Sequence, residues 1–213
     1  MEKQSKGQIT QQFILEEARK IYNVDGINLT LRELADKMGV TIGRITNYFP
    51  TRDYLFAGMS KVYQEEYELL VSNFKWESKI SLNQLYQLNG QIMDLQYKHR
   101  CLLLYTCGTS INQKVMISQI GKTWKSNLGG FEKLIVMLID AGLIKENARD
   151  ENAFIQLRFQ YINLFTTWLV SYTIYDAKQS YKKMKPVYQK GILESLMPYF
   201  TSKGLKQFRA LSG

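Results

Sequence analysis

TLRELADKMGVTIGRITNYFPTRD, residues 30–53, predicts two short helices joined by a tight turn, with a third helix directly after them. Thr30 and Glu33 have the spacing of a capping box, which satisfies free backbone N–H groups where a helix begins. Gly39 lies where the end of the first helix favours a residue in the left-handed conformation. Pro50 ends the second helix, because proline lacks an N–H group and disfavours helical geometry in the residue before it.

The second predicted helix, Ile42–Phe49, has the composition of a DNA-recognition helix. A helix, a glycine-containing turn and another helix form the shape of a DNA-binding helix-turn-helix. We expect Ile45, Phe49 and the ring of Tyr48 to form its buried side. Arg can pair with guanine, Asn can pair with adenine, and Thr or Ile can contact a thymine methyl group. The residues predicted to contact bases are Ile42, Gly43, Arg44, Thr46 and Asn47. The alternative is an ordinary helical hairpin with a polar face, since this geometry also occurs in proteins that do not bind DNA.

The same stretch resembles the N-terminal domain of the TetR family of bacterial transcriptional regulators. The sequence departs from the family pattern at Thr46, where the family usually has Tyr, and at Ile42, where Lys or Arg is frequent. The motif covers only the N-terminal part of the chain, and the remainder is similar in length and helical layout. The matching positions are Thr30, Leu34, Ala35, Gly39, Val40, Thr41, Gly43, Ile45, Tyr48, Phe49, Pro50, Arg52, Asp53 and Leu55.

The resemblance implies an all-α protein with two domains. Residues 1–54 would form a three-helix DNA-binding domain, and residues 55–213 a larger helical domain for effector binding and dimerisation. The expected function is that of a homodimeric regulator, a repressor, that a small-molecule effector releases from a palindromic DNA operator. A protein-interaction module that has lost sequence-specific DNA binding is the alternative, which Ile42 and Thr46 keep open. We expect phosphate contacts from Thr30, Arg32, Thr41, Tyr48 and Arg52.

The composition is that of a soluble globular protein, with 213 residues, 45% hydrophobic and 22% charged. A net charge of +9 is compatible with a polyanionic partner. The excess lies at the C-terminus, however, because residues 1–60 hold eight basic and seven acidic residues, whereas residues 176–213 hold eight and two. The positions of Arg32, Arg44 and Arg52 therefore support DNA binding better than the net charge does.

Several other classes of protein have no support in the sequence. Cys101 and Cys107 are too few for a disulfide scaffold. The polar N-terminus has no signal peptide, and no apolar run reaches transmembrane length, so we expect a cytoplasmic protein without membrane contact. No nucleophile elbow, phosphate-binding glycine loop or metal signature occurs. We therefore expect neither an enzyme nor a cofactor or metal site.

The two predicted helices over about residues 151–175 and 181–200 are strongly apolar. A helix that is apolar nearly all round needs partners on two sides, so we predict that these helices form the dimer face. The resemblance implies the same arrangement, in which each subunit contributes two helices to a four-helix bundle. The predicted interface residues are Leu157, Tyr161, Leu164, Phe165, Trp168, Val187, Tyr188, Gly191 and Ser195.

The larger domain also contains polar groups inside apolar helices, with aromatic residues in the same segments. A pocket with aromatic walls and a few polar groups would suit a small amphipathic effector. The alternative is that the aromatic rings are core and that the polar groups are satisfied locally. The candidate effector-binding residues are Gln96, His99, Tyr105, Trp124, Phe131, Asn163 and Thr167.

Overall fold

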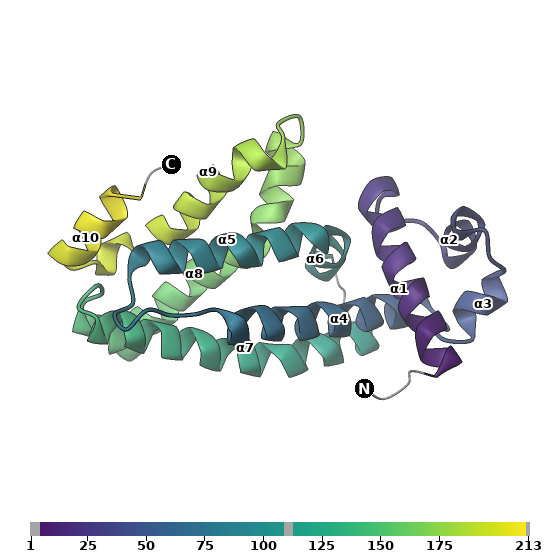
Figure 1. The fold of residues 1–213 in the computed structure, drawn as a ribbon, viewed down its shortest axis with the longest axis horizontal. Coiled ribbons are helices and arrows are strands. Elements are labelled where there is room, and N and C mark those ends of the chain that lie inside the picture. The colour runs from purple at the N-terminus through teal and green to yellow at the C-terminus, as the bar shows by residue number, and fades with distance from the viewer. Residues whose placement is uncertain (1–4, 109–112, 212–213) are drawn as a thin grey trace. The chain divides into compact units, whose positions relative to one another are not determined.

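The computed structural model describes residues 5–108 and 113–211, with only the backbone described for residues 122–128. The prediction of an all-α protein is confirmed (Figure 1). In the described part of the chain, β structure is limited to one antiparallel bridge between Ile144 and Phe200. Short 3-10 turns occupy Glu146–Arg149 and Met197–Tyr199, and a π-helical turn occupies Tyr172–Asp176. The helices are α1 (Lys6–Asp25), α2 (Leu31–Met38), α3 (Ile42–Thr46), α4 (Arg52–Asn73), α5 (Leu82–Lys98), α6 (Arg100–Cys107), α7 (Lys114–Asp140), α8 (Glu151–Ser171), α9 (Tyr181–Glu194) and α10 (Ser202–Arg209).

The chain forms two compact units. The first comprises Met1–Glu66 and Lys98–Thr123, and the second comprises Tyr67–Tyr97 and Trp124–Gly213. The first unit is therefore larger than the predicted DNA-binding domain. The reason is that the first turns of α4 and the buried face of α6 share one hydrophobic core with α1, α2 and α3. The functional division at residues 54 and 55 stays a prediction.

Local signals in the sequence set the bounds of α2. The backbone N–H of Thr30 donates to Glu33 Oε2 at 2.7 Å, and the backbone N–H of Glu33 donates to Thr30 Oγ1 at 3.2 Å. The predicted capping box is thereby confirmed. At the other end, Gly39 has a φ of 64°, and its N–H donates to the carbonyl groups of Ala35 and Asp36. The turn to α3 follows directly.

The helix predicted to recognise DNA, α3, is shorter than expected. It ends at Thr46, and residues 47–48 form a turn instead of continuing the helix to Phe49. The backbone N–H of Tyr48 donates to Ile45 O at 3.0 Å, which is the tighter pattern of a 3-10 turn. Pro50 disfavours helical geometry at Phe49, and the side chain of Phe49 enters the core. The prediction that the Tyr48 ring lies on the buried side is wrong, because this side chain is 36% exposed.

Aromatic rings from three helices pack against one another in the core of the first unit. The Phe56 ring of α4 stacks on the Tyr105 ring of α6 at a centroid separation of 3.7 Å, and it lies 5.0 Å from the Tyr22 ring of α1. Ile45 and Phe49 join this core, and both are buried. The same core therefore holds α3 in place.

Long-range hydrogen bonds join the helices of the second unit. The Tyr161 hydroxyl of α8 donates to Asn89 Oδ1 of α5 at 2.8 Å. The Gln189 side-chain amide of α9 donates to the backbone carbonyl of Tyr86. Because these buried polar groups pair across elements, they fix which face of each helix is turned inward. None of the helices in the described residues combines the length and the apolar character needed to cross a membrane.

Candidate nucleic-acid interface

Four of the residues predicted to contact bases lie on α3, and Asn47 lies in the turn directly after it. Arg44 and Asn47 are exposed, and Ile42 is 41% exposed. Gly43 and Thr46 are half-buried. Ile45, by contrast, is fully buried and anchors the helix. A short helix held through one side and presenting polar groups on the other has the geometry needed to enter a DNA groove.

The side chain of Arg44 is supported from α1. Its Cζ atom lies 5.8 Å from the centroid of the Phe13 ring, within the range of a cation–π contact. Phe13 is 43% exposed although it is a large apolar residue. No role for Phe13 was predicted from the sequence, because this residue lies outside the helix-turn-helix. The signal available in the sequence was a phenylalanine next to the buried stripe of α1, which includes Ile14, Ala18 and Tyr22.

The predicted phosphate contacts Thr30, Arg32, Thr41 and Tyr48 all have exposed side chains. The Thr30 hydroxyl, however, also takes part in the capping box with Glu33. Thr41 makes no side-chain hydrogen bond to the first turn of α3. These positions lie at the beginning of α2, at the beginning of α3 and just after it, where exposed polar groups can reach a DNA backbone.

Arg52, the fifth predicted phosphate contact, has internal partners. Its guanidinium donates to the backbone carbonyl of Asn28 at 3.3 Å, and its Cζ lies 5.8 Å from the Tyr105 ring centroid. The side chain is half-buried and connects the start of α4 to the loop before α2 and to α6. The structure thus gives Arg52 a stabilising role, and its contact with phosphate stays a prediction.

The residue after Arg52 connects the start of α4 to α7. Asp53 Oδ2 accepts hydrogen bonds from the backbone N–H groups of Val115 and Met116, at 3.1 and 3.3 Å. A carboxylate in this position satisfies free N–H groups in the first turn of α7 and interacts favourably with the helix dipole. Asp53 follows α3 closely in the chain, so these two bonds tie the beginning of α7 to the helix-turn-helix of the first unit.

A second connection joins α1 to the segment where α5 ends and α6 begins. Arg19 Nη1 and Asn23 Nδ2 both donate to the backbone carbonyl of Lys98, at 3.0 and 2.8 Å. Asn23 Oδ1 accepts from the backbone N–H of Cys101 at 3.0 Å, and Arg100 donates to the Asn23 carbonyl at 2.8 Å. Four hydrogen bonds between one face of α1 and residues 98–101 therefore hold these two segments together.

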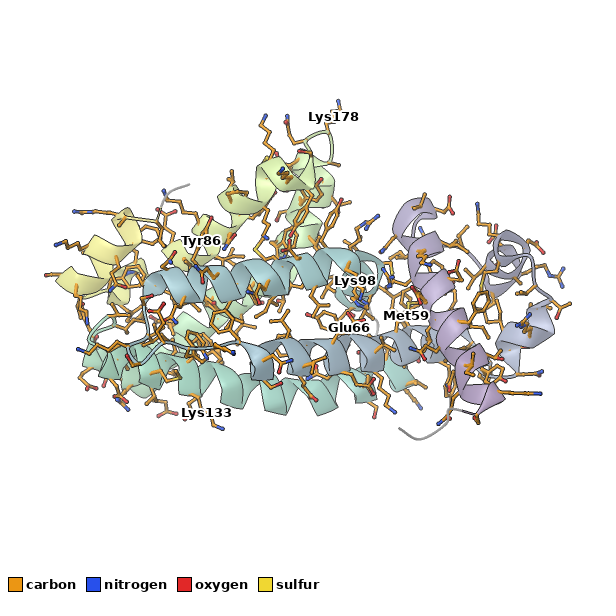
Figure 2. The ribbon with its side chains drawn as sticks, in the orientation of Figure 1. Met59, Glu66, Tyr86, Lys98, Lys133 and Lys178 are labelled. Carbon is orange, nitrogen blue, oxygen red and sulfur yellow. The ribbon has the colours of Figure 1, made fainter. Side chains whose placement is uncertain are left out.

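A cluster of ionisable groups lies beside this connection, next to a small cavity of about 150 Å³. Figure 2 shows the Lys98 ammonium and the Glu66 carboxylate pointing toward each other, and Lys98 Nζ donates to Glu66 Oε2 at 2.6 Å. The same oxygen lies 3.2 Å from Nε2 of His99, a side chain that is almost completely buried. The cavity is lined by Gln12, Leu15, Glu16, Arg19, Met59, Val62, Glu66, Lys98 and His99.

The ionisation states within this cluster follow from burial and hydrogen bonding. Burial lowers the pKa of the His99 imidazole, and the hydrogen bond with Glu66 opposes this effect only in part. Burial raises the pKa of Glu66, but hydrogen bonds from Lys98 and His99 outweigh it, so the pKa lies below its usual value. A neutral imidazole that carries its proton on Nε2 therefore donates to an ionised Glu66.

The predicted effector-binding residues are distributed over both units. His99 lines the cavity of the first unit, whereas the Tyr105 ring is part of the aromatic stack, and its oxygen accepts a hydrogen bond from Gln113 at 2.5 Å. In the second unit, Gln96 accepts from Trp168 Nε1 at 2.5 Å and donates to the Phe165 carbonyl at 3.0 Å. The polar groups of Tyr105 and Gln96 are thus satisfied within the chain.

The remaining candidates for effector binding differ in exposure. Phe131 is buried, and its ring stacks on that of Tyr161 at 5.3 Å. Asn163 and Thr167 are exposed and bond within their own helix: Asn163 donates to the Phe159 carbonyl and Thr167 to the Asn163 carbonyl. The side chain of Trp124 lies outside the described residues. Asn163 and Thr167 therefore fit the alternative to a pocket, in which the polar groups are satisfied by hydrogen bonds within their own helix.

Three of the predicted dimer-face residues are instead core residues of their own chain. Leu157 is 0% exposed, and Tyr161 and Trp168 are 4% and 3% exposed. The Tyr161 hydroxyl and the Trp168 indole N–H both donate hydrogen bonds to side chains of α5. Leu157, Tyr161 and Trp168 were therefore wrongly assigned to the dimer surface. Because α8 is apolar on several faces, its sequence could not indicate which face packs inside the chain.

Other predicted interface residues lie at the surface. Leu164 and Val187 are 45% and 61% exposed, and Gly191 is also exposed. Phe165, Tyr188 and Ser195 are half-buried. Two further apolar side chains of α8 are exposed, Ile155 and Phe159, of which Phe159 is 68% exposed. The outer faces of α8 and α9 thus carry exposed apolar groups, but not the full set that was predicted.

The arrangement of α2, the turn at Gly39 and α3 defines a helix-turn-helix protein. Neither protein-family models nor curated proteins match the sequence. Solved structures do match. A TetR-family transcriptional regulator from Marinobacter aquaeolei VT8 has a TM-score of 0.75 at 16% identity, covering 95% of this chain and 96% of that one.

Two further solved structures share the fold. A gamma-butyrolactone receptor described as ArpA-like has a TM-score of 0.62 at 13% identity, covering 97% of this chain and 96% of its own. SmeT in complex with triclosan has a TM-score of 0.60 at 16% identity, with coverages of 91% and 93%. The chain therefore has the fold of the TetR-family transcriptional regulators, as its helix-turn-helix motif predicted.

Proposed function

We propose that this protein is a homodimeric transcriptional regulator, a repressor, that binds a palindromic DNA operator through α3. The observation that carries this proposal is the anchoring of α3 by Ile45 and Phe49, which leaves Ile42, Arg44 and Asn47 exposed. An exposed Arg on α3 and an exposed Asn in the turn directly after it match the donor and acceptor patterns of guanine and adenine. The fold shared with known regulators supports the same conclusion.

Exposed apolar residues of the second unit support dimerisation. Ile155, Phe159 and Leu164 of α8 and Val187 of α9 are between 43% and 68% exposed. A second copy of the chain would bury these side chains and bring two recognition helices to one palindrome. Because Leu157, Tyr161 and Trp168 are internal, the proposed dimer surface is the outer side of α8 together with the exposed side of α9.

We propose that a small-molecule effector controls DNA binding. Two proteins with this fold are described as a gamma-butyrolactone receptor and as a complex with triclosan, which supports ligand control in this chain. An effector would release DNA by binding more tightly to the arrangement that cannot bind DNA. In this proposal residues 1–54 bind DNA and residues 55–213 respond to the effector and dimerise.

Arg44→Ala is expected to relax the sequence specificity of DNA binding. An operator selected from a random double-stranded pool should be palindromic, with half-sites about one helical turn apart. Loss of the Arg44 contact should weaken binding by about 1–3 kcal/mol and remove the preference at one base pair of each half-site. Titration of the operator and of single-base variants measures both effects.

Arg32→Ala is the matched control, because Arg32 is an exposed basic residue predicted to contact phosphate. It should weaken all sequences uniformly and lower the slope of log K against log salt by about one. If Arg44→Ala also weakened all sequences equally, α3 would not recognise bases as proposed. Weak binding at every salt concentration and no selected motif would contradict a DNA-binding function and favour the protein-interaction alternative.

Phe159→Asp is expected to dissociate the dimer. A buried aromatic anchor at an interface contributes about 2 kcal/mol or more, so the dimer dissociation constant should rise about thirtyfold or more. Sedimentation equilibrium measures this constant directly. Val24→Asp is the control, since Val24 is an 80% exposed apolar residue of α1. An unchanged association constant for Phe159→Asp would exclude the outer side of α8 as the dimer surface.

A further inference from the structure

We propose that Phe13 is a positioning residue that determines specificity: its ring holds the guanidinium of Arg44 in the orientation needed to contact a base. This inference rests on the proposed DNA-binding function and deepens it. Phe13 belongs to α1, outside the helix-turn-helix, and the ring does not itself have to contact DNA.

The surroundings of the Arg44 side chain indicate that the Phe13 ring is what holds the guanidinium. The Arg44 Cζ atom lies 5.8 Å from the Phe13 ring centroid. Within the part of the chain that the structure describes, no hydrogen bond or ion pair holds the Arg44 side chain. An aromatic face attracts a guanidinium electrostatically at this separation. The contact therefore selects among the conformers of an otherwise unrestrained side chain.

The platform that carries Phe13 is well fixed. Its neighbour Ile14 is fully buried in the core of the first unit. The first turn of α1 is closed by a capping box between Ser5 and Gln8. A Cβ atom placed on Gly7 would lie 3.7 Å from the Tyr48 hydroxyl, so the start of α1 runs close to the end of the recognition segment. Phe13 is thus held at a defined position relative to α3.

The exposure of Phe13 also fits this role. A phenylalanine that is 43% exposed adds little to the core, whereas an aromatic face at the surface can stack on a guanidinium. Arg loses conformational freedom when it makes two parallel hydrogen bonds to guanine. Holding the planar group beforehand reduces this loss and favours the one base pair that the fixed orientation matches.

The contact can be measured without DNA. In the free protein, ring currents of Phe13 should shift the NMR signals of the Arg44 side-chain protons away from their positions in exposed arginines. Phe13→Leu should abolish this shift, whereas Phe13→Tyr should keep it. Val24→Ala, at the exposed far end of the same helix, should leave it unchanged. Arg44 signals that are identical in the wild type and in Phe13→Leu would overturn the proposal.

The functional consequence is measured on the selected operator and on the variant altered at the base pair that Arg44→Ala identifies. Phe13→Leu should lower the discrimination between these two DNAs by about two- to fivefold, as expected for one exposed cation–π contact. Phe13→Tyr should retain the discrimination. In an Arg44→Ala background, Phe13→Leu should cause no further change in the discrimination between the two DNAs.

Two results would distinguish a failure of the positioning role from a failure of the proposed DNA-binding function. A uniform loss of affinity in Phe13→Leu that persists in the Arg44→Ala background would show that Phe13 contacts DNA itself or supports the fold, and would overturn the positioning role alone. If the wild type selects no sequence, the proposed function fails and the specificity role fails with it. Circular dichroism of each variant shows whether its helices are intact.

Discussion

Phe56→Ala is expected to lower the free energy of unfolding of the first unit by about 3–5 kcal/mol. Phe56 is fully buried, and its ring contacts those of Tyr105 and Tyr22, at centroid separations of 3.7 and 5.0 Å. The substitution removes the apolar contacts, leaves a cavity and removes the ring that contacts both Tyr22 of α1 and Tyr105 of α6. Urea unfolding followed by circular dichroism measures the loss.

The consequence for DNA binding follows from the shared core. Ile45 and Phe49 hold α3 against the same cluster that contains Phe56. Destabilising this cluster should therefore lower the fraction of molecules that present an ordered α3, and operator binding should weaken at higher temperature. Tyr54→Ala is the matched control on the same helix, because Tyr54 is 48% exposed, and it should change stability by no more than about 0.5 kcal/mol. Similar losses for both variants would contradict a core role for Phe56.

Gly204→Ala is expected to destabilise the second unit by about 3 kcal/mol. A Cβ atom at this position would lie 2.2 Å from the backbone oxygen of Leu143 and 3.2 Å from Cβ of Phe200. The oxygen cannot move aside freely, because it accepts a hydrogen bond from the backbone N–H of Thr201 at 3.1 Å. Relief of the contact would require α10 to move away from the turn after α7.

Gly130→Ala is the control for this substitution. Gly130 is an exposed residue within α7, and a Cβ atom there would meet nothing within 4 Å. Because alanine favours a helix over glycine, this variant should be more stable by about 0.5–1 kcal/mol. Thermal unfolding of the two variants beside the wild type measures changes of opposite sign. Equal midpoints would show that α10 does not pack against Leu143 as closely as the structure has it.

Much of the helix-turn-helix could be predicted because its signals are local. The capping box of Thr30 and Glu33 and the left-handed Gly39 depend on residues within one or two turns. The burial of Ile45 and the exposure of Arg44 follow from the helical period in a segment with few apolar residues. The sequence by itself therefore determined the helix-turn-helix and the side of α3 that faces solvent.

The tertiary structure alone decided which apolar residues of the larger unit are internal. In α8 the apolar residues occupy several faces, so the helical period cannot distinguish the buried Leu157 from the exposed Phe159. The partner of Trp168 is Gln96, which lies 72 residues away in the chain, and no local pattern connects the two. The packing of α8 against α5 determines which of its apolar residues are buried.

The same distinction applies to the charged residues in and around α3. The sequence determined that Arg44 and Arg52 lie in or beside it, but not what their side chains contact. Arg52 turns toward the Asn28 carbonyl and the Tyr105 ring, whereas Arg44 lies by the ring of Phe13. Local hydrogen bonding and helical periodicity are encoded within a few residues, and they determined the secondary structure and the fold class. The partners of long side chains depend on which elements meet in space, so only the tertiary structure decided them.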